Sequence, residues 1–181
     1  MDISKLHFVQ PEFAKHAQAV LDFRRKFNAV NPELHGASEL NAFSDSGIIG
    51  WFHYLNAPAG SNWFGYAKVA DSTYLAMLDE VVVGIVNIRH ELNDFLLQFG
   101  GHVGYSTHPD YQGRGIATAM LRFAVARLNE LGVNRILITC DEHNIGSQLV
   151  ISKNGGVLEN TLAHPSNAGK KRRRYWIGNE N

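Results

Sequence analysis

The chain has 181 residues, of which 45% are hydrophobic and 19% charged, a composition typical of a globular protein. Its 17 basic and 17 acidic residues give a net charge of zero, which argues against nucleic acid as a partner. The single cysteine excludes an internal disulfide, and the nine histidines lack metal-site spacing. Without a signal-peptide pattern or an apolar run long enough for a membrane span, we expect one cytoplasmic domain over residues 1–181, binding neither metal nor membrane.

The first half of the chain predicts two helices and a β-hairpin. Apolar residues recur at helical spacing after Pro11, and Ser44 or Asp45 would suit the N-cap of the second helix. A proline- and glycine-rich loop then leads to two β-rich segments separated by two acidic residues. The expected strand, helix and hairpin strands cover residues 6–9, 12–27, 73–78 and 81–89.

The second half predicts a strand–helix–strand unit, which favours a parallel pair of strands with a right-handed crossover. The unit covers residues 102–108, 115–131 and 135–140, and its last strand is almost entirely apolar, as expected for burial on both faces. Residues 90–101 predict a loop or a single helical turn. A helix and two closing strands follow, over residues 145–153, 157–162 and 173–177.

The sequence YQGRGIA, at residues 111–117, places two glycines directly before the longest expected helix. Such glycines let a phosphate approach the backbone N–H groups of a helix N-terminus. A Walker A loop is excluded because no lysine followed by serine or threonine occurs here. A dinucleotide loop, and with it a nucleotide-binding dehydrogenase, fits loosely because Thr118 stands where glycine or alanine is expected. From the glycines alone, a tight turn before a helix is an equal alternative.

The pattern Gln112-x-x-Gly115-x-Ala117 resembles the pyrophosphate loop of the GNAT superfamily, the acyl-CoA-dependent N-acyltransferases. The resemblance covers most of residues 73–177. Within the family, the chain is similar to one branch of predicted acetyltransferases. It implies the GNAT fold, an α/β domain (α+β in some schemes) with a mixed, twisted sheet and helices on both faces. It further implies acetyl-CoA as co-substrate, and direct transfer of the acetyl group, in a ternary complex, to a primary amine of a small molecule or protein. Family members are often homodimers.

The resemblance also implies which residues hold the cofactor. The strand before the loop would present backbone groups to the pantetheine arm and to the thioester carbonyl. The loop and the helix start would hold the pyrophosphate with backbone N–H groups. Two polar residues opening the next helix would lie near the pantetheine, the first of them also suiting an N-cap. The predicted cofactor-binding residues are Tyr105, Ser106, Thr107, Gln112, Gly113, Arg114, Gly115, Ile116, Ala117, Thr118, Asn144 and Ser147.

The catalytic acid and base are left open by the sequence. Many family members use a tyrosine as the acid, but the equivalent residue here is Ile151, so water, Ser147 or a tyrosine elsewhere, such as Tyr175, would have to serve. His102 is the candidate catalytic base, because it lies on the strand before the glycine loop and histidine titrates near neutral pH. The alternative is a hydrogen-bonded structural histidine. Because the usual acid is missing, a non-catalytic acyl-CoA-binding module is the main alternative function.

Several other polar residues are weaker candidates. Acidic and histidine side chains near two strand ends are candidate amine-binding groups. His90 and Glu91 follow one strand, and their alternative is a solvated loop. Asp141, Glu142 and His143 lie at the end of the other strand. Cys140 ends an apolar strand, so we expect a buried thiol in the core rather than a thiol that carries the acyl group during transfer. The basic run at 170–174 favours the turn of a terminal hairpin over a contact with RNA or with the 3′-phosphate of coenzyme A.

Overall fold

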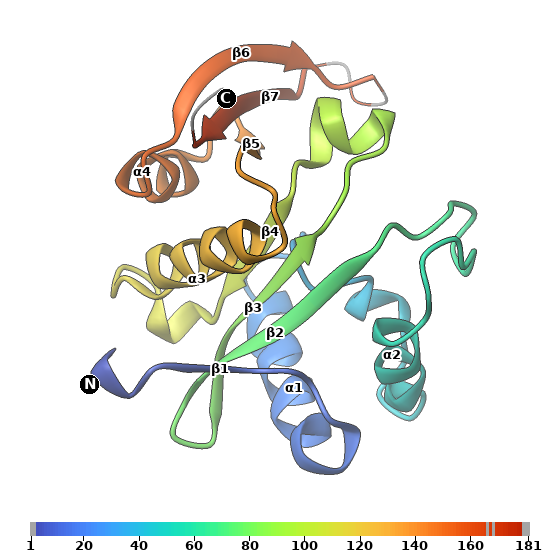
Figure 1. The fold of residues 1–181 in the computed structure, drawn as a ribbon. Coiled ribbons are helices and arrows are strands. Elements are labelled where there is room, and N and C mark those ends of the chain that lie inside the picture. The colour runs from blue at the N-terminus through green and yellow to red at the C-terminus, as the bar shows by residue number, and fades with distance from the viewer. Residues whose placement is uncertain (1–2, 166, 168, 179–181) are drawn as a thin grey trace.

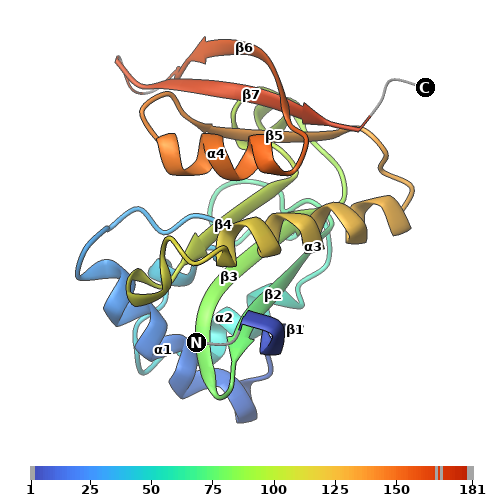
Figure 2. The same cartoon turned by 90° about the vertical axis from the view of Figure 1, so that its left-hand side faces the viewer.

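The computed structural model describes residues 3–165, 167 and 169–178, and it contains two antiparallel sheets (Figures 1 and 2). The predicted single domain also includes residues outside this described part. The larger sheet has the order β1-β2-β3-β4, formed by His7–Val9, Asp71–Leu78, Val81–Arg89 and Val103–Thr107. The smaller sheet has the order β5-β7-β6, formed by Ile136–Asp141, Lys171–Ile177 and Val157–Ala163.

Helices cover both faces of the larger sheet (Figure 1). On one face lie α1 (Phe13–Asn28) and α2 (Ile48–Leu55), whereas α3 (Ile116–Glu130) packs on the other face and contacts α4 (Ile145–Lys153). Because successive side chains of a strand point to opposite faces, β2 and β3 supply both cores. Leu75 and Ile85 belong to the core under α1 and α2, and their chain neighbours Ala76 and Val86 belong to the core under α3.

The expected helices and strands are confirmed, with shifts at some ends. The second helix begins at Ile48 rather than near Ser44, because the Ser44 side chain accepts a hydrogen bond from the Gly47 N–H (3.0 Å) in a turn that precedes the helix. The segment after β3 contains one π-helical turn, Leu96–Gly100. Within the described part of the chain, no helix combines the length and apolar character needed to cross a membrane.

The expected parallel pairing of the two strands around α3 does not form a ladder, because β4 and β5 belong to different sheets. They are joined where the His102 N–H donates to the Leu137 carbonyl (2.8 Å) and the Leu137 N–H donates to Nδ1 of the His102 ring (2.9 Å). The His102 carbonyl accepts from the Arg89 N–H at the end of β3 (2.7 Å). One histidine thus links the two sheets at the start of β4.

Candidate active site

A cavity of about 510 Å³ lies where β4, the N-terminus of α3 and one side of α4 meet the loop between α1 and α2. The predicted cofactor-binding residues line it, with the exception of Arg114. The Arg114 guanidinium carbon lies 5.7 Å from the ring centre of Tyr111. Residues from distant parts of the chain therefore converge on one cavity, as the motif pattern predicts.

The glycine loop takes the backbone conformation that its two glycines allow. Gly113 and Gly115 have φ angles of 73° and 84°, in the region that other residues rarely adopt. Gly115 is the N-cap residue of α3, and within the described structure no side chain caps this helix. The N–H groups of the first turn have no partner inside a helix, and the helix dipole is positive at this end. This end of the cavity is therefore suited to an anion.

Two polar side chains of the motif hold the walls of the cavity. Gln112 Nε2 donates to the Thr107 carbonyl at the end of β4 (3.4 Å), which keeps the glycine loop close to this strand. Asn144 Oδ1 accepts from the Ser147 N–H (2.9 Å), so it caps α4 as its position suggests. Both bonds fix the backbone that lines the cavity.

Tyr105 lines the cavity on the β4 side and carries a buried hydroxyl. The hydroxyl oxygen is inaccessible to solvent and has no hydrogen-bond partner among the described residues. Burial raises the pKa of Tyr105 to about 12, although the nearby Ser147 side chain acts in the opposite direction. The phenol is therefore protonated at neutral pH and can donate a hydrogen bond.

The loop between α1 and α2 is fixed tightly against β4. The buried Ser106 hydroxyl accepts from the His35 N–H (3.0 Å) and donates to the His35 carbonyl (2.7 Å). Gly36, with a φ of 67°, packs so closely on the strand that a Cβ there would lie 2.1 Å from the Gly104 carbonyl carbon. His35 is therefore held at a defined position beside β4.

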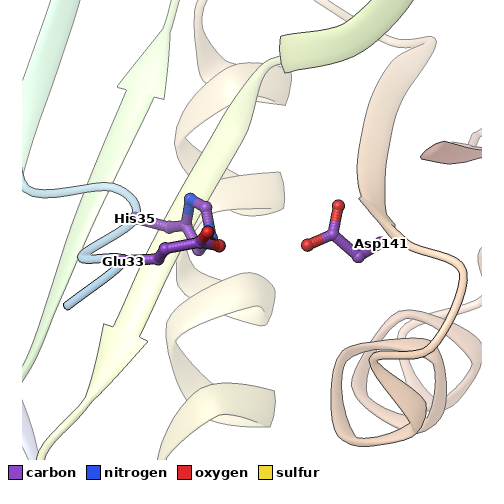
Figure 3. A group of neighbouring side chains, drawn as sticks. All are labelled: Glu33, His35 and Asp141. Atoms are coloured by element: carbon purple, nitrogen blue, oxygen red, sulfur yellow. The ribbon is translucent and has the colours of Figure 1, made fainter. Parts of the chain in front are cut away.

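Three titratable side chains meet beside this loop (Figure 3). Glu33 and His35 point from the loop and Asp141 points from the end of β5, so that they face one another between the two sheets. One polar atom of each lies within 4.8 Å of the others, and Glu33 Oε2 is 4.0 Å from His35 Nε2. Glu33 and His35 also line the cavity.

Two basic residues of the terminal hairpin neutralise the carboxylates of this group. Lys170 pairs with Glu33 (2.7 Å) and Arg172 pairs with Asp141 (2.8 Å). The hydrogen bond from Lys170 lowers the pKa of Glu33. Burial, followed by the charge of Arg172, lowers the pKa of His35, which is therefore neutral at pH 7.

His102 lies outside the lining of this cavity, and only 6% of its surface is exposed. Burial lowers its pKa to about 4, and its Nδ1 already accepts the Leu137 N–H. A ring in this position acts as a structural acceptor between the sheets. The role of His102 as catalytic base stays a prediction, and this geometry favours the structural alternative.

The other candidate residues His90, Cys140, Ile151 and Tyr175 do not line the cavity. His90 Nε2 bonds the Ser72 hydroxyl (2.8 Å) away from the cavity lining. Cys140 is buried with its pKa raised to about 11 by burial, as for a core thiol. Ile151 and Tyr175 are both buried in the core under α3, so neither reaches the cavity.

The basic run at 170–174 is engaged in contacts within the protein. Besides the pairs of Lys170 and Arg172, the run forms an ion pair between Lys171 and Glu142 (3.8 Å). Arg173 bonds Gln148 (2.9 Å), and Arg174 pairs with Glu159 and bonds the Leu97 carbonyl. These contacts support the interpretation of the run as part of a hairpin rather than a nucleic-acid surface.

Sequence reasoning missed Glu33, His35 and Lys153 as residues of the cavity. Glu33 and His35 come from the N-terminal third of the chain, where no motif singles them out. A contact between residue 35 and residue 106 leaves no local pattern in the sequence. Only the HG pair, in which glycine permits a close approach, hints at a special position.

Comparison with protein families identifies the class of this protein. The model described as "Acetyltransferase (GNAT) domain" matches residues 16–157, so the chain belongs to the GNAT acetyltransferase family. Membership makes it an acetyl-CoA-dependent N-acetyltransferase with the GNAT fold. No curated protein matches the chain significantly.

Solved structures agree with this fold. The chain is similar to RimJ from Mycobacterium smegmatis in complex with CoA-disulfide, with 18% identity, a TM-score of 0.72 and coverage of 96% of this chain and 81% of that one. An acetyltransferase from Salmonella typhimurium that modifies the N-terminal serine of ribosomal protein L7/L12 has 15% identity, a TM-score of 0.67 and coverage of 98% and 96%. The acetyl-CoA complex of yncA, a putative acetyltransferase from Salmonella typhimurium, has 12% identity, a TM-score of 0.61 and coverage of 96% and 94%.

The structural role of His102 predicts a loss of stability in mild acid. Its folded pKa of about 4 lies below the ordinary value of 6.5, so the unfolded chain binds the proton more tightly. The stabilisation is complete above pH 6.5 and is lost as the pH falls towards 4. From pH 7 to pH 5, we expect His102 to contribute a decrease of about 1–2 kcal/mol in the free energy of unfolding.

Urea unfolding of the wild type and of His102→Gln at both pH values measures this contribution. Glutamine retains a side-chain acceptor but does not titrate, so the decrease should shrink by that amount in the variant. His53→Gln, at an exposed position on α2, serves as the control and should keep the wild-type decrease. Equal decreases in His102→Gln and His53→Gln would contradict the prediction.

Proposed function

We propose that this protein transfers the acetyl group of acetyl-CoA to a primary amine of a small molecule or a peptide, by direct attack of the amine within a ternary complex. The observation that carries the proposal is the convergence of the uncapped N-terminus of α3 and the residues of β4 on one cavity. The helix end suits the pyrophosphate, and the neighbouring strand suits the thioester arm. Acetyl-CoA supplies the activated acetyl group.

The residues of the cavity divide the binding of acetyl-CoA between them. In this proposal, the backbone N–H groups from Gly113 to Thr118 bind the pyrophosphate, as a helix N-terminus binds phosphates elsewhere. Lys153, which lines the same cavity, adds a positive charge for a phosphate group. Tyr105, Ser106 and Thr107 orient the pantetheine and place a backbone donor at the thioester carbonyl.

Tyr105 is our candidate for the acid that protonates the departing thiolate. The residue lines the cavity, and its buried hydroxyl is protonated at neutral pH, lies near the Ser147 side chain and has no hydrogen-bond partner among the described residues. It would take the part of the usual catalytic tyrosine, whose position on α4 is occupied here by Ile151, and would act from a strand instead. Proton donation from a positioned group typically accelerates a reaction by about 10²–10⁴-fold.

In this proposal the acceptor is a primary amine, and the similar structures suggest which classes of amine to consider. One similar enzyme modifies the N-terminal serine of a ribosomal protein. The proposal therefore includes peptide N-termini as well as small amines. Glu33 and His35 line the cavity and Asp141 faces them, so this group is suited to receive an ammonium ion, because two carboxylates and a neutral imidazole all accept hydrogen bonds.

An amine panel tests the proposed activity. We expect release of free coenzyme A from acetyl-CoA when the protein is mixed with at least one class among peptide α-amines, lysine ε-amines, amino acids and polyamines. A thiol reagent measures the release, since the buried Cys140 adds little background. Tight binding of acetyl-CoA without turnover of any amine would instead favour the non-catalytic module.

The glycine loop predicts a sharp loss of cofactor binding in Gly115→Glu. A carboxylate at this position would repel the pyrophosphate, so acetyl-CoA should no longer raise the melting temperature. For the wild type we expect an increase of roughly 5–10 °C at an acetyl-CoA concentration about 100 times the Kd, and none with NAD.

Gly132→Glu is the matched control. Gly132 follows the other end of α3 and has a φ of 83° against 84° for Gly115, and a Cβ added to it would meet no described atom within 4 Å. Both variants therefore carry similar backbone strain and the same added charge. A normal response to acetyl-CoA in Gly115→Glu would refute the assignment of the pyrophosphate to this loop.

Removal of the Tyr105 hydroxyl should slow the chemical step. We expect the kcat of Tyr105→Phe to fall by about 10²-fold while the KM for acetyl-CoA changes little, because the aromatic ring is retained. Tyr74→Phe is the control, since Tyr74 packs against the core under α3 and not against the cavity. A kcat equal to that of the wild type would exclude Tyr105 as the acid.

A further inference from the structure

We infer that His35 is the catalytic base, and that it accepts the proton of the acceptor's ammonium group in the space between β4 and β5, facing Glu33 and Asp141. The inference rests on the proposed function, because it requires an amine acceptor. No motif marks His35, and it lies about seventy residues before the cofactor-binding strand.

The position of His35 is fixed by the strand that we assign to the thioester arm. The Ser106 hydroxyl binds both backbone groups of His35, at 3.0 and 2.7 Å, and the next residue, Gly36, packs directly on Gly104. About half of the His35 side chain is exposed, and it lines the cavity. A base must reach the reacting proton and then return it to solvent, and this placement serves both needs.

The groups facing His35 come from each element packed around it. Glu33 from its own loop and Asp141 from β5 carry negative charge, whereas Lys170 from the hairpin and Arg172 from β7 carry positive charge. Ser106 on β4 holds its backbone. Burial, followed by the charge of Arg172, keeps the ring neutral and able to accept a proton. The Glu33 carboxylate can bind the incoming ammonium ion where that ion displaces Lys170.

The reaction balances with these residues alone. His35 takes one proton from the ammonium group, and the resulting amine attacks the thioester carbonyl carbon, forming a C–N bond. The C–S bond breaks, and the thiolate receives a proton from Tyr105, which recovers one from the acylated nitrogen through the cavity. His35 releases its proton to solvent. The sum is an amide, free coenzyme A and one proton.

A base of this strength favours weakly basic amines. The pKa of His35 is below its ordinary 6.5, whereas a peptide α-amine has a pKa of about 7.7–8.0 and a lysine ε-amine about 10.4. Proton transfer to the same base is thus more than 100-fold less favourable from the ε-amine. We therefore expect a peptide amide with a free α-amine to be acetylated faster than Nα-acetyl-lysine amide.

The pH dependence of kcat/KM tests the assignment, with the fastest amine of the panel as acceptor. In the wild type, kcat/KM should be nearly flat from about pH 6.5 to the pKa of the amine, because His35 removes the proton from the bound ammonium form. In His35→Ala, only free amine present in solution reacts. Its kcat/KM should be about 100-fold lower at pH 7 and should rise tenfold per pH unit.

Added imidazole should partly restore His35→Ala in proportion to its concentration, an effect that a structural role would not produce. His53→Ala, at an exposed position on α2, should match the wild type and ignore imidazole. The inference is overturned if His35→Ala keeps the wild-type rate and profile, if His102→Gln alone changes the profile, or if EDTA abolishes the wild-type rate. A wild type that acetylates no amine would contradict the proposed function itself and remove the inference with it.

Discussion

The hydrogen bonds of His102 hold the two sheets together at the point where their strands separate. Its backbone binds Arg89 of β3 and Leu137 of β5, and its ring accepts the Leu137 N–H that a neighbouring strand would otherwise take. A continuous ladder between β4 and β5 would leave the backbone of β4 with no free edge. Because the ladder is replaced by a single residue, Tyr105 and Thr107 face a cavity instead of a neighbouring strand.

The cavity needs a second wall, and the loop between α1 and α2 provides it. Gly36 and Gly104 meet without side chains, and the Ser106 hydroxyl replaces the partners that the His35 backbone would have had in a strand. This arrangement brings residues from the N-terminal third of the chain to the strand that carries the cofactor motif. The two halves of the site therefore have different origins in the sequence, a motif on one side and a tertiary contact on the other.

This difference explains how much the sequence could predict. The helix at 116–130, the glycine loop and the helix cap at Asn144 depend on contacts within a few residues, and they were predicted from residue type and spacing. The separation of β4 from β5 depends on His102, whose ring takes the place of a backbone carbonyl, and strand patterns carry no sign of such a substitution. The position of His35 depends on a contact 71 residues away, so its place beside β4 was not predictable.

The basic run of the terminal hairpin shows the same limit and suggests how the site admits a substrate. In sequence, five adjacent cations favour a solvated turn, whereas in the structure Lys170 and Arg172 reach back to Glu33 and Asp141. The Lys170–Glu33 pair is about half exposed on both sides, and such surface pairs contribute roughly 0–1 kcal/mol. An ammonium ion can therefore replace Lys170 at Glu33 at little cost, while the less exposed Arg172 keeps Asp141 in place. In the proposed reaction, the weakness of that one ion pair would leave the group around His35 accessible to an acceptor.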